Sequence, residues 1–216
     1  MIELHTWTTS NGRKIPIMLE ETGLPYRVRW VNLRKREQFD PAFLAINPNN
    51  KIPAIIDLDG PGGAPLPIFE SGAILIHLGE KSGRFYPAEP VARSKVRQWL
   101  FFQVGHVGPT FGQVSHFRGK FPDTEDYGKT RFIKEMARVY GVLERRLGEA
   151  EYLAEDYSIA DMATYPWVRI YQRQGIDITA YPNVARWIAA IDARPAVQRA
   201  NTLIDEKRKA AEREIA

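Results

Sequence analysis

Hydrogen-bond donors gather in the stretch "TTSNG", residues 8–12, just before a segment with helical spacing. Thr9 donates through its hydroxyl group and Asn11 through its side-chain amide, and Ser10 lies between them. Free N–H groups and the dipole at a helix N-terminus add positive potential, so such a turn can stabilise a negative charge. The simpler interpretation is a solvated turn with an N-cap.

The chain has 216 residues and no cysteine. This composition excludes a structural disulfide, a thiolate zinc site and a cysteine nucleophile. Any thiol chemistry must therefore use a thiol supplied by a bound small molecule. His106 and His116 do not form a spaced pair with carboxylates, so we predict no metal site.

A proline interrupts the apolar segment "IPAIIDL", residues 52–58, which otherwise has the composition of a buried strand. Proline lacks a backbone N–H, so an edge strand with a trans Ile52–Pro53 bond is the simpler interpretation. Lys51, just before it, is by default a surface charge. Glu70 and Ser71 begin a segment with helical spacing, where their default role is to start the helix.

The elements that must position these residues alternate along the N-terminal part of the chain. Strands follow from apolar–polar alternation or from short apolar runs, and helices from apolar residues at helical spacing with stop signals. In this scheme Pro16 is tolerated only in the first turn of its helix. The predicted order is strand 2–7, helix 13–22, strand 26–33, helix 41–46, strand 52–58, strand 66–69 and helix 71–81.

Breakers in "KSGRFYPAEP" indicate a linker, and every convincing pattern beyond it is helical. One stripe of apolar residues at helical spacing comprises Phe132, Met136, Val139, Leu143 and Leu147. We therefore predict two domains with a linker between them: a thioredoxin-like α/β domain at residues 1–82, a linker at 83–90 and an α-helical domain at 91–216.

The charge is too evenly mixed to indicate a nucleic-acid partner, with 30 basic and 26 acidic residues and a net charge of +4. No apolar run approaches the roughly 20 residues of a membrane helix. The N-terminal residues lack the apolar core of a secretory signal, so we expect a cytoplasmic protein with no membrane partner.

Three motifs, "NPNNKIPAI", "FESGAILIHLGEK" and "YSIADMATYPWV", resemble the glutathione transferases through nearly the whole chain. "TTSNGRKIPIMLEE" and "QVGHVGPTFGQVSHF" are most similar to the nu-class bacterial disulfide-bond oxidoreductases of that family. The class is also similar to a yeast prion-forming relative. The resemblance implies a thioredoxin-like domain followed by a helical one, and a homodimer.

The resemblance also implies a site for glutathione as co-substrate, with two molecules or the oxidised form and no metal. In the family the peptide bond before this proline is cis, which implies an open strand edge at Ile52 and Pro53 for the cysteinyl residue of glutathione. Glu70 and Ser71 would hold the γ-glutamyl end. Three further side chains are implied in binding: Lys51 and Gln38 at the glycyl carboxylate, and Arg131 from the same or the neighbouring subunit. Gln38 also fits an exposed polar loop, and Arg131 a solvated helix face.

Many members of the family hold the thiolate with a tyrosine, serine or cysteine after the first strand. No cysteine exists here and no tyrosine is near, so Thr9 and Asn11 resemble the nu-class pair, with Ser10 as a third candidate. The implied function is glutathione-dependent reduction of small-molecule disulfides, with organic peroxides as second acceptors. The alternatives are conjugation of glutathione to electrophiles and a non-catalytic glutathione carrier or interaction module.

Overall fold

Alternating and apolar segments of the N-terminal part form one sheet with the strand order β2-β1-β3-β4. β1 (Ile2–Thr6) pairs parallel with β2 (Tyr26–Trp30). β3 (Ala54–Asp57) pairs antiparallel with β1 and with β4 (Leu66–Phe69). The structure is a computed structural model and describes residues 1–120 and 127–214. Its sheet confirms the predicted thioredoxin-like order.

The described chain divides into two compact units. The first contains the residues up to Arg84 together with those from Arg194 onward, and the second is Phe85–Ala193. The predicted linker at residues 83–90 spans the first of these boundaries. The predicted helical domain ran on to residue 216, whereas the last helix, α10 (Pro195–Arg213), groups with the first unit.

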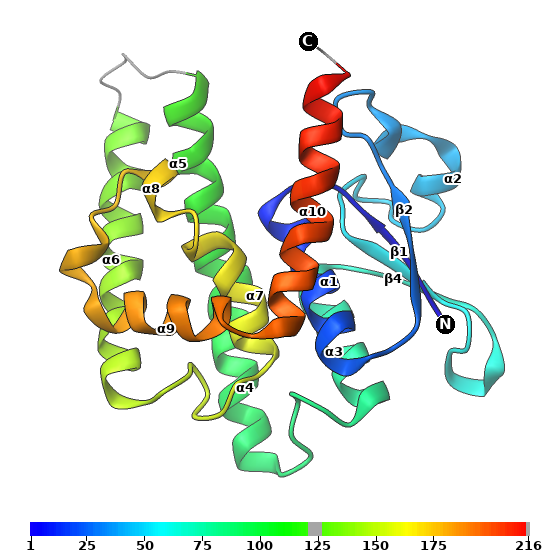
Figure 1. Cartoon of the computed structure of the whole chain (residues 1–216), viewed down its shortest axis with the longest axis horizontal. Coiled ribbons are helices and arrows are strands. Elements are labelled where there is room, and N and C mark those ends of the chain that lie inside the picture. Colours follow the sequence, from blue (N-terminus) through cyan, green and yellow to red (C-terminus); the bar gives the residue numbers. More distant parts are fainter. Residues whose placement is uncertain (121–126, 215–216) are drawn as a thin grey trace. The chain divides into compact units, whose positions relative to one another are not determined.

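α10 joins the first unit because it packs along α1 (Ser10–Thr22), as Figure 1 shows. Charged pairs connect the two helices: Arg13 donates to Asp205 at 2.6 Å, and Arg199 donates to Glu20 at 2.7 Å. Lys207 of α10 also lies over the rings of Trp7 and Trp30, with its Nζ 5.3 and 5.7 Å from their centroids. The C-terminal helix is therefore part of the unit that carries the sheet.

α1 begins three residues earlier than predicted, and Pro16 lies in its buried interior instead of its first turn. A proline at this position removes the N–H that would bond the carbonyl of Gly12, four residues back. The buried hydroxyl of Thr6 donates to that carbonyl at 2.9 Å and replaces the missing bond. The helix tolerates Pro16 because the end of β1 satisfies the carbonyl that proline leaves without its usual donor.

The remaining elements of the first unit are short, apart from α3, which packs against α1 and the sheet. They are η1 (Glu37–Phe39), α2 (Pro41–Leu44), η2 (Pro61–Gly63) and α3 (Ser71–Ser82). α3 starts at Ser71 as predicted. β3, in contrast, starts only at Ala54, so Ile52 and Pro53 precede the strand instead of forming its first residues.

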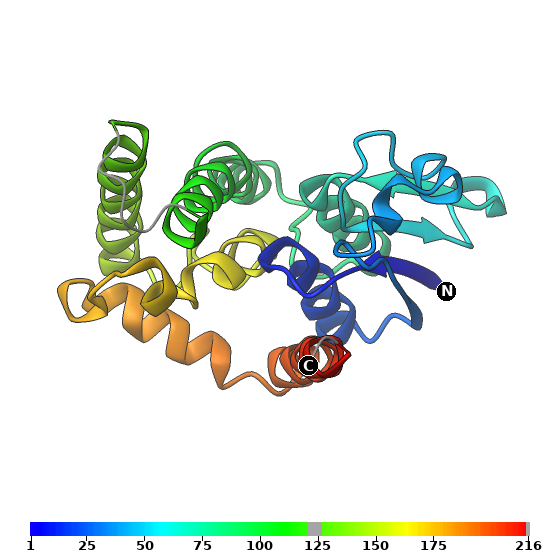
Figure 2. The same ribbon diagram turned by 90° about the horizontal axis from the view of Figure 1, so that it is seen from above.

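The second unit is helical in the part that the structure describes, as predicted (Figure 2). α7 packs against α4, α5 and α9, and Ile159–Pro166 within it are buried. From the predicted stripe, Met136, Val139, Leu143 and Leu147 are buried on α6. The elements are α4 (Pro90–Phe102), the π-helical turn η3 (Gln103–Val107), α5 (Gly108–Lys120), α6 (Tyr127–Glu149), α7 (Ile159–Val168), α8 (Tyr171–Gln174), η4 (Ile178–Ala180) and α9 (Pro182–Asp192).

α5 was not predicted, because Gly108, Pro109 and Gly112 had the composition of a helix-breaking segment. α5 continues without a break from the π-helical turn η3, and Pro109 lies just after that turn. Within the described ranges, no helix combines the length and the apolar character that crossing a bilayer requires.

Candidate functional site

The register of the sheet brings the candidate segments of the first unit to one end. His5 pairs with Ala54, and Ala54 pairs with Phe69, so β1 ends where β3 starts and β4 ends. β2 ends there too, because Trp30 pairs with Thr6. The segments that carry Thr9 to Asn11, Gln38, Lys51 to Pro53, and Glu70 to Ser71 therefore all adjoin this end of the sheet.

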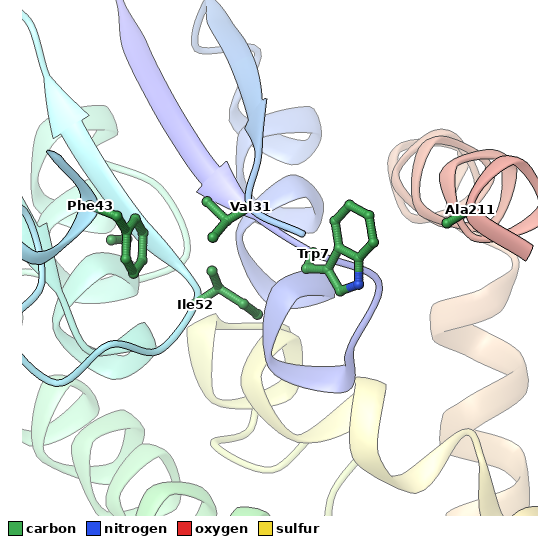
Figure 3. Packing of buried hydrophobic residues seen from close by; sticks show 6 residues of the cluster. Trp7, Val31, Phe43, Ile52 and Ala211 are labelled. Carbon is green, nitrogen blue, oxygen red and sulfur yellow. The ribbon is translucent and has the colours of Figure 1, made fainter. Parts of the chain in front are cut away.

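An apolar cluster lies beneath these segments (Figure 3). Its buried members are Trp7, Val31, Phe43, Ile52, Ala54 and Ala211. Trp7 and Val31 directly follow strands β1 and β2, and Ile52 lies within the candidate segment that precedes β3. In Figure 3 the side chains of Val31 and Ile52 lie next to each other between Phe43 and Trp7. Packing among these three side chains fixes the positions at which the segments leave the sheet.

The predicted donors Thr9, Ser10 and Asn11 lie half-buried at the start of α1. Thr9 is the N-cap, and its Oγ1 accepts from the N–H of Gly12 at 3.0 Å. An N-cap hydroxyl that accepts in this way keeps its own proton available for a further acceptor. The first turn of α1 contains no acidic residue, so its positive potential is not offset locally.

Gly12 allows this turn to lie against the end of β1. A Cβ added at this position would be 2.0 Å from the carbonyl oxygen of Trp7 and 2.7 Å from Oγ1 of Thr6. A backbone carbonyl cannot move aside as a flexible side chain does, so only glycine fits. The close approach places Thr9 to Asn11 directly beyond the strand.

The peptide bond between Ile52 and Pro53 is cis, as the resemblance implied. Ile52 is buried and lies outside the ladder, which begins at Ala54. Its main-chain N–H and C=O groups make no hydrogen bond with the described part of the chain. Lys51 is exposed, and Asn47 accepts and donates within its turn, with its Nδ2 donating to the carbonyl of Lys51 at 2.6 Å.

Glu70 and Ser71 stand at the start of α3. Glu70 is exposed and is the N-cap residue, with a φ of 69° that residues other than glycine rarely adopt. Its carboxylate makes no capping bond and accepts from Nδ2 of Asn49 at 3.4 Å. Ser71 is buried as the first residue of the helix, whose first N–H groups have no partner within the helix.

Lys14 is a functional candidate that the sequence analysis missed. It is buried on α1, and its Nζ donates to Oγ of Ser71 at 3.2 Å. Burial lowers the pKa of Lys14 to about 7, and the negative charge of Glu70 opposes this shift. A lysine one turn into a helix carries no sequence signal for burial, so this side chain could be identified only from the structure.

Gln38 and Arg131 are the two remaining candidates. Gln38 lies half-buried in η1, and its Oε1 is buried without a partner in the described part of the chain. Arg131 belongs to the second unit, whereas the other candidates belong to the first. It lines a hollow of about 680 Å³ on α6, together with Tyr127, Thr130, Phe132, Lys134, Glu135 and Arg138.

The arrangement in the first unit suits an extended peptide with a carboxylate at one end. The open main chain of Ile52 can pair with a peptide, and the start of α3 can accept an anion. The start of α1 offers donors for a third group. Among residues 1–120 and 127–214, no cluster of histidine and acidic side chains is arranged to hold a metal ion.

Comparison with known proteins identifies both parts of the chain. Residues 9–81 match the N-terminal domain of the glutathione S-transferases, and residues 113–195 match the C-terminal domain. The disulfide-bond oxidoreductase YfcG of Escherichia coli is 48% identical over 202 residues, which cover 93% of this chain and 94% of YfcG.

Two similar crystal structures contain the tripeptide itself. A glutathione transferase from Pseudomonas putida, with one glutathione disulfide bound per subunit, has a TM-score of 0.88 and 44% identity over 92% of this chain and 90% of its own. One from Burkholderia graminis, with two glutathione molecules per subunit, has a TM-score of 0.85 and 46% identity over 92% of this chain and 86% of its own. On these matches, which extend through both parts of the chain, the protein belongs to the glutathione transferase family.

Proposed function

We propose that the chain is a glutathione-dependent disulfide-bond oxidoreductase that uses the thiolate of bound glutathione to open small-molecule disulfides. The observation that carries the proposal is the unpaired main chain of Ile52 beside two helix starts, in a chain without a sulfur nucleophile of its own. The similarity to YfcG, named as a disulfide-bond oxidoreductase, supports this activity over other reactions of the family.

Each part of the proposed site binds a different group of the tripeptide. Its cysteinyl residue pairs with Ile52 as a short added strand, because Pro53 offers no N–H and the ladder begins only at Ala54. The γ-glutamyl carboxylate binds Ser71 and the N–H groups at the start of α3. Glu70 pairs with the ammonium group of the same residue.

The glycyl carboxylate lies at the opposite end of the bound tripeptide. Lys51, exposed beside Ile52, meets it as a point charge, and Gln38 provides an amide donor. Arg131 completes the set from its own subunit or from a neighbouring one. These assignments give each charged group of glutathione a partner of opposite charge or a donor.

The thiolate is held at the start of α1. Thr9 and Asn11 donate to the sulfur, and Ser10 is the alternative hydroxyl. A free thiol has a pKa near 8.5 and is mostly protonated at neutral pH, and donors at a helix N-terminus lower that pKa. The protein thereby makes a nucleophile from a co-substrate.

The reaction is two successive thiol–disulfide exchanges. The glutathione thiolate attacks one sulfur of the acceptor disulfide, the S–S bond breaks, and the leaving thiolate takes a proton from solvent. A second glutathione thiolate then attacks the mixed disulfide, which releases the second acceptor thiol and forms oxidised glutathione. Two glutathione molecules supply the two electrons.

A chain without cysteine must bind both glutathione molecules itself, because no resolving cysteine is available. We therefore propose that the site accommodates two tripeptides or one molecule of oxidised glutathione. Two similar proteins with these ligands, one with the disulfide and one with two molecules per subunit, support this stoichiometry.

Organic peroxides are a second acceptor class, consistent with the nu-class resemblance. The thiolate attacks one peroxide oxygen, the O–O bond breaks, and the alkoxide that leaves takes a proton from solvent to become an alcohol. The resulting sulfenic acid of glutathione condenses with the thiol of the second glutathione to give the disulfide and water. The same bound thiolate performs both reactions, so the peroxide activity depends on the same donors at the start of α1.

Assay of one preparation with three acceptors tests the proposal. We expect glutathione-dependent reduction of a small hydroxyalkyl disulfide, measured by coupling to glutathione reductase, and weaker reduction of an organic hydroperoxide. Strong activity with a chlorodinitroaromatic and none with the disulfide would establish conjugation instead. Tight glutathione binding without turnover of any acceptor would establish a carrier or interaction module.

We further propose that the protein is a homodimer that acts in the cytoplasm, where glutathione is kept reduced. Phe69 at the end of β4 and Phe101 on α4, which are 38% and 63% exposed, are candidates for the contact between subunits. Light scattering on the purified protein should give twice the 24.7 kDa mass of the chain.

A further inference from the structure

Lys14 is a lysine that is buried inside the first unit. Its side chain is 2% exposed, within the part of the first unit where α1, α3 and the sheet pack together. A lysine is almost never fully buried unless it is paired, because removing its charge from water is costly. A buried lysine in this position therefore indicates a use for its charge.

The side chain of Lys14 ends at the start of α3. Its Nζ donates to Oγ of Ser71, the first residue of that helix, at 3.2 Å. The first turn of α3 contains no acidic residue, and Glu70 makes no capping bond there. The positive end of the helix and the lysine charge therefore act on the same small volume, where the γ-glutamyl carboxylate is proposed to bind.

We propose that Lys14 is a positioning residue for the γ-glutamyl carboxylate of glutathione, acting through the Ser71 hydroxyl and taking up a proton when the tripeptide binds. The inference rests on the glutathione site proposed above and adds a residue and a proton to it. Ser71 accepts from Lys14, which orients its own O–H toward the carboxylate.

The uptake of a proton by Lys14 on ligand binding can be measured, because its ammonium group is only partly charged in the free protein. Burial lowers the pKa of its ammonium group to about 7, so near neutral pH the free protein contains both charged and neutral forms. A carboxylate bound nearby favours the charged form and raises the pKa, so binding draws a proton from solvent. Uptake is largest between the pKa of the free state and that of the bound state.

Among the charged groups of the neighbouring elements, Glu70 acts on Lys14, and several others bind each other. Glu70, at the start of α3, is the group whose charge raises the pKa of Lys14. Asp205 on α10 binds Arg13 on α1, and Glu3 binds His5 on β1. Asp57 on β3 binds His77 and Lys81 on α3. Glu20 and Glu21 at the far end of α1 bind Arg199 and Arg194 of the C-terminal segment.

Calorimetry with S-methylglutathione tests the proposal, because this ligand has no thiol to titrate. Binding is measured from about pH 6 to about pH 8.5 in buffers of different ionisation enthalpy, which gives the number of protons taken up. We expect uptake by the wild type above neutral pH, little uptake at the acidic end, and affinity that falls as the pH rises.

Two substitutions of Lys14 separate its charge from its packing. In Lys14→Met the proton uptake should disappear. The affinity for S-methylglutathione near pH 6 should fall about tenfold, because one charge-assisted hydrogen bond is lost. Lys14→Arg keeps a charge that does not titrate in this range, so affinity should be largely retained and independent of pH. Lys51→Met is the matched control, which should bind more weakly with unchanged proton uptake.

The outcomes distinguish the two proposals. Binding of S-methylglutathione without proton uptake by the wild type, or with the same uptake in Lys14→Met, overturns the role of Lys14 and leaves the glutathione site standing. Absence of any binding by the wild type overturns the site and Lys14 together. The wild-type measurement needs no variant, so a failure of Lys14→Met to fold does not affect it.

Discussion

In the proposed function, Asn11 and Thr9 act on a sulfur atom that belongs to glutathione and not to the chain. Their own geometry is fixed by the start of α1, where Thr9 already accepts from Gly12 and keeps its O–H proton available. Hydrogen bonds to a charged acceptor contribute about 1.5–3 kcal/mol, more than bonds between neutral groups. Loss of one donor should therefore appear in the ionisation of the thiol.

Replacement of Asn11 by alanine tests this expectation. We expect Asn11→Ala to raise the pKa of the thiol of bound glutathione by about 1–2 units and to lower disulfide turnover at neutral pH about 10- to 100-fold. The ultraviolet absorbance of the thiolate against pH measures the first effect. Asn183→Ala, an asparagine bound to Glu144 in the second unit, is the control. An unchanged rate in Asn11→Ala would move the thiolate contact to Thr9 or Ser10.

Asp161 is a buried carboxyl group whose surroundings are structural. It forms the capping box with Ser158 and also accepts from the N–H of Leu153 and from Nε1 of Trp187. Burial raises the pKa of Asp161 to about 6, although these hydrogen bonds lower it. The folded state therefore binds the proton more tightly than the unfolded state, and the stabilisation is lost as the pH rises.

The free energy of unfolding, measured against pH, should show the ionisation of Asp161. The stabilising contribution is full below the ordinary pKa of 3.8 and is lost as the pH rises through about 6. Its size is about 3 kcal/mol. Asp161→Asn does not titrate, so urea unfolding of this variant should lack that decline between pH 4 and 7, about the range of the shift. Parallel curves for the two proteins would show that Asp161 stays ionised throughout.

Some residues of the candidate site could be assigned from the sequence, and others only from the structure. Pro53, Ser71 and Thr9 were assigned from motifs, and the structure places them at one end of one sheet. Lys14 was not assigned, because a lysine has the same sequence signal whether it is solvated or buried. Asn47 and Asn49 were missed for a related reason: their partners, Lys51 and Glu70, are set by loop conformation and tertiary contact.

At the scale of elements, α1 depends on a bond from outside itself. Pro16 in its interior leaves the carbonyl of Gly12 without its usual donor, and the hydroxyl of Thr6 supplies the bond. Sequence rules located the helix but placed Pro16 in its first turn, because a rule for proline in helices takes no account of a strand hydroxyl. α5 was missed in the same way, because its glycines and proline were taken as breakers.

A double-mutant cycle tests the hydrogen bond from the hydroxyl of Thr6 to the carbonyl of Gly12. Thr6→Val keeps the shape of the side chain and removes the donor, so it should lower the free energy of unfolding by about 1–3 kcal/mol. Pro16→Ala restores an N–H opposite the same carbonyl. The cost of Thr6→Val should therefore be smaller in the Pro16→Ala background, by at least about 0.5 kcal/mol in urea unfolding. Equal costs in both backgrounds would show that Thr6 acts only through packing.

At the scale of the whole molecule, the first unit is built from two stretches of chain that flank the second. Arg13 is 2% exposed, and α10 supplies partners for it in Asn201 and Asp205. Removal of α10 would leave a guanidinium group without these partners and expose the apolar side of α1. The first unit therefore should not fold from residues 1–84 alone.

Two fragments test this expectation. Residues 1–84 should be poorly folded by circular dichroism, whereas the same residues joined through a long Gly/Ser linker to residues 194–214 should unfold cooperatively. In the joined fragment, Asp205→Ala should lower stability by about 1–3 kcal/mol, because Arg13 loses its charged partner. Cooperative unfolding of residues 1–84 alone would show that α10 is dispensable.

The turn between β3 and β4 offers a place to attach a probe. Asp57 pairs with Ile2 and with Leu66, so this turn lies at the end of the sheet opposite the candidate site. Ala64 within it is exposed. Because the natural chain has no sulfhydryl group, Ala64→Cys would give a single attachment point for a fluorophore or a solid support. Labelling there would allow ligand binding to be followed without a reporter near the reacting sulfur.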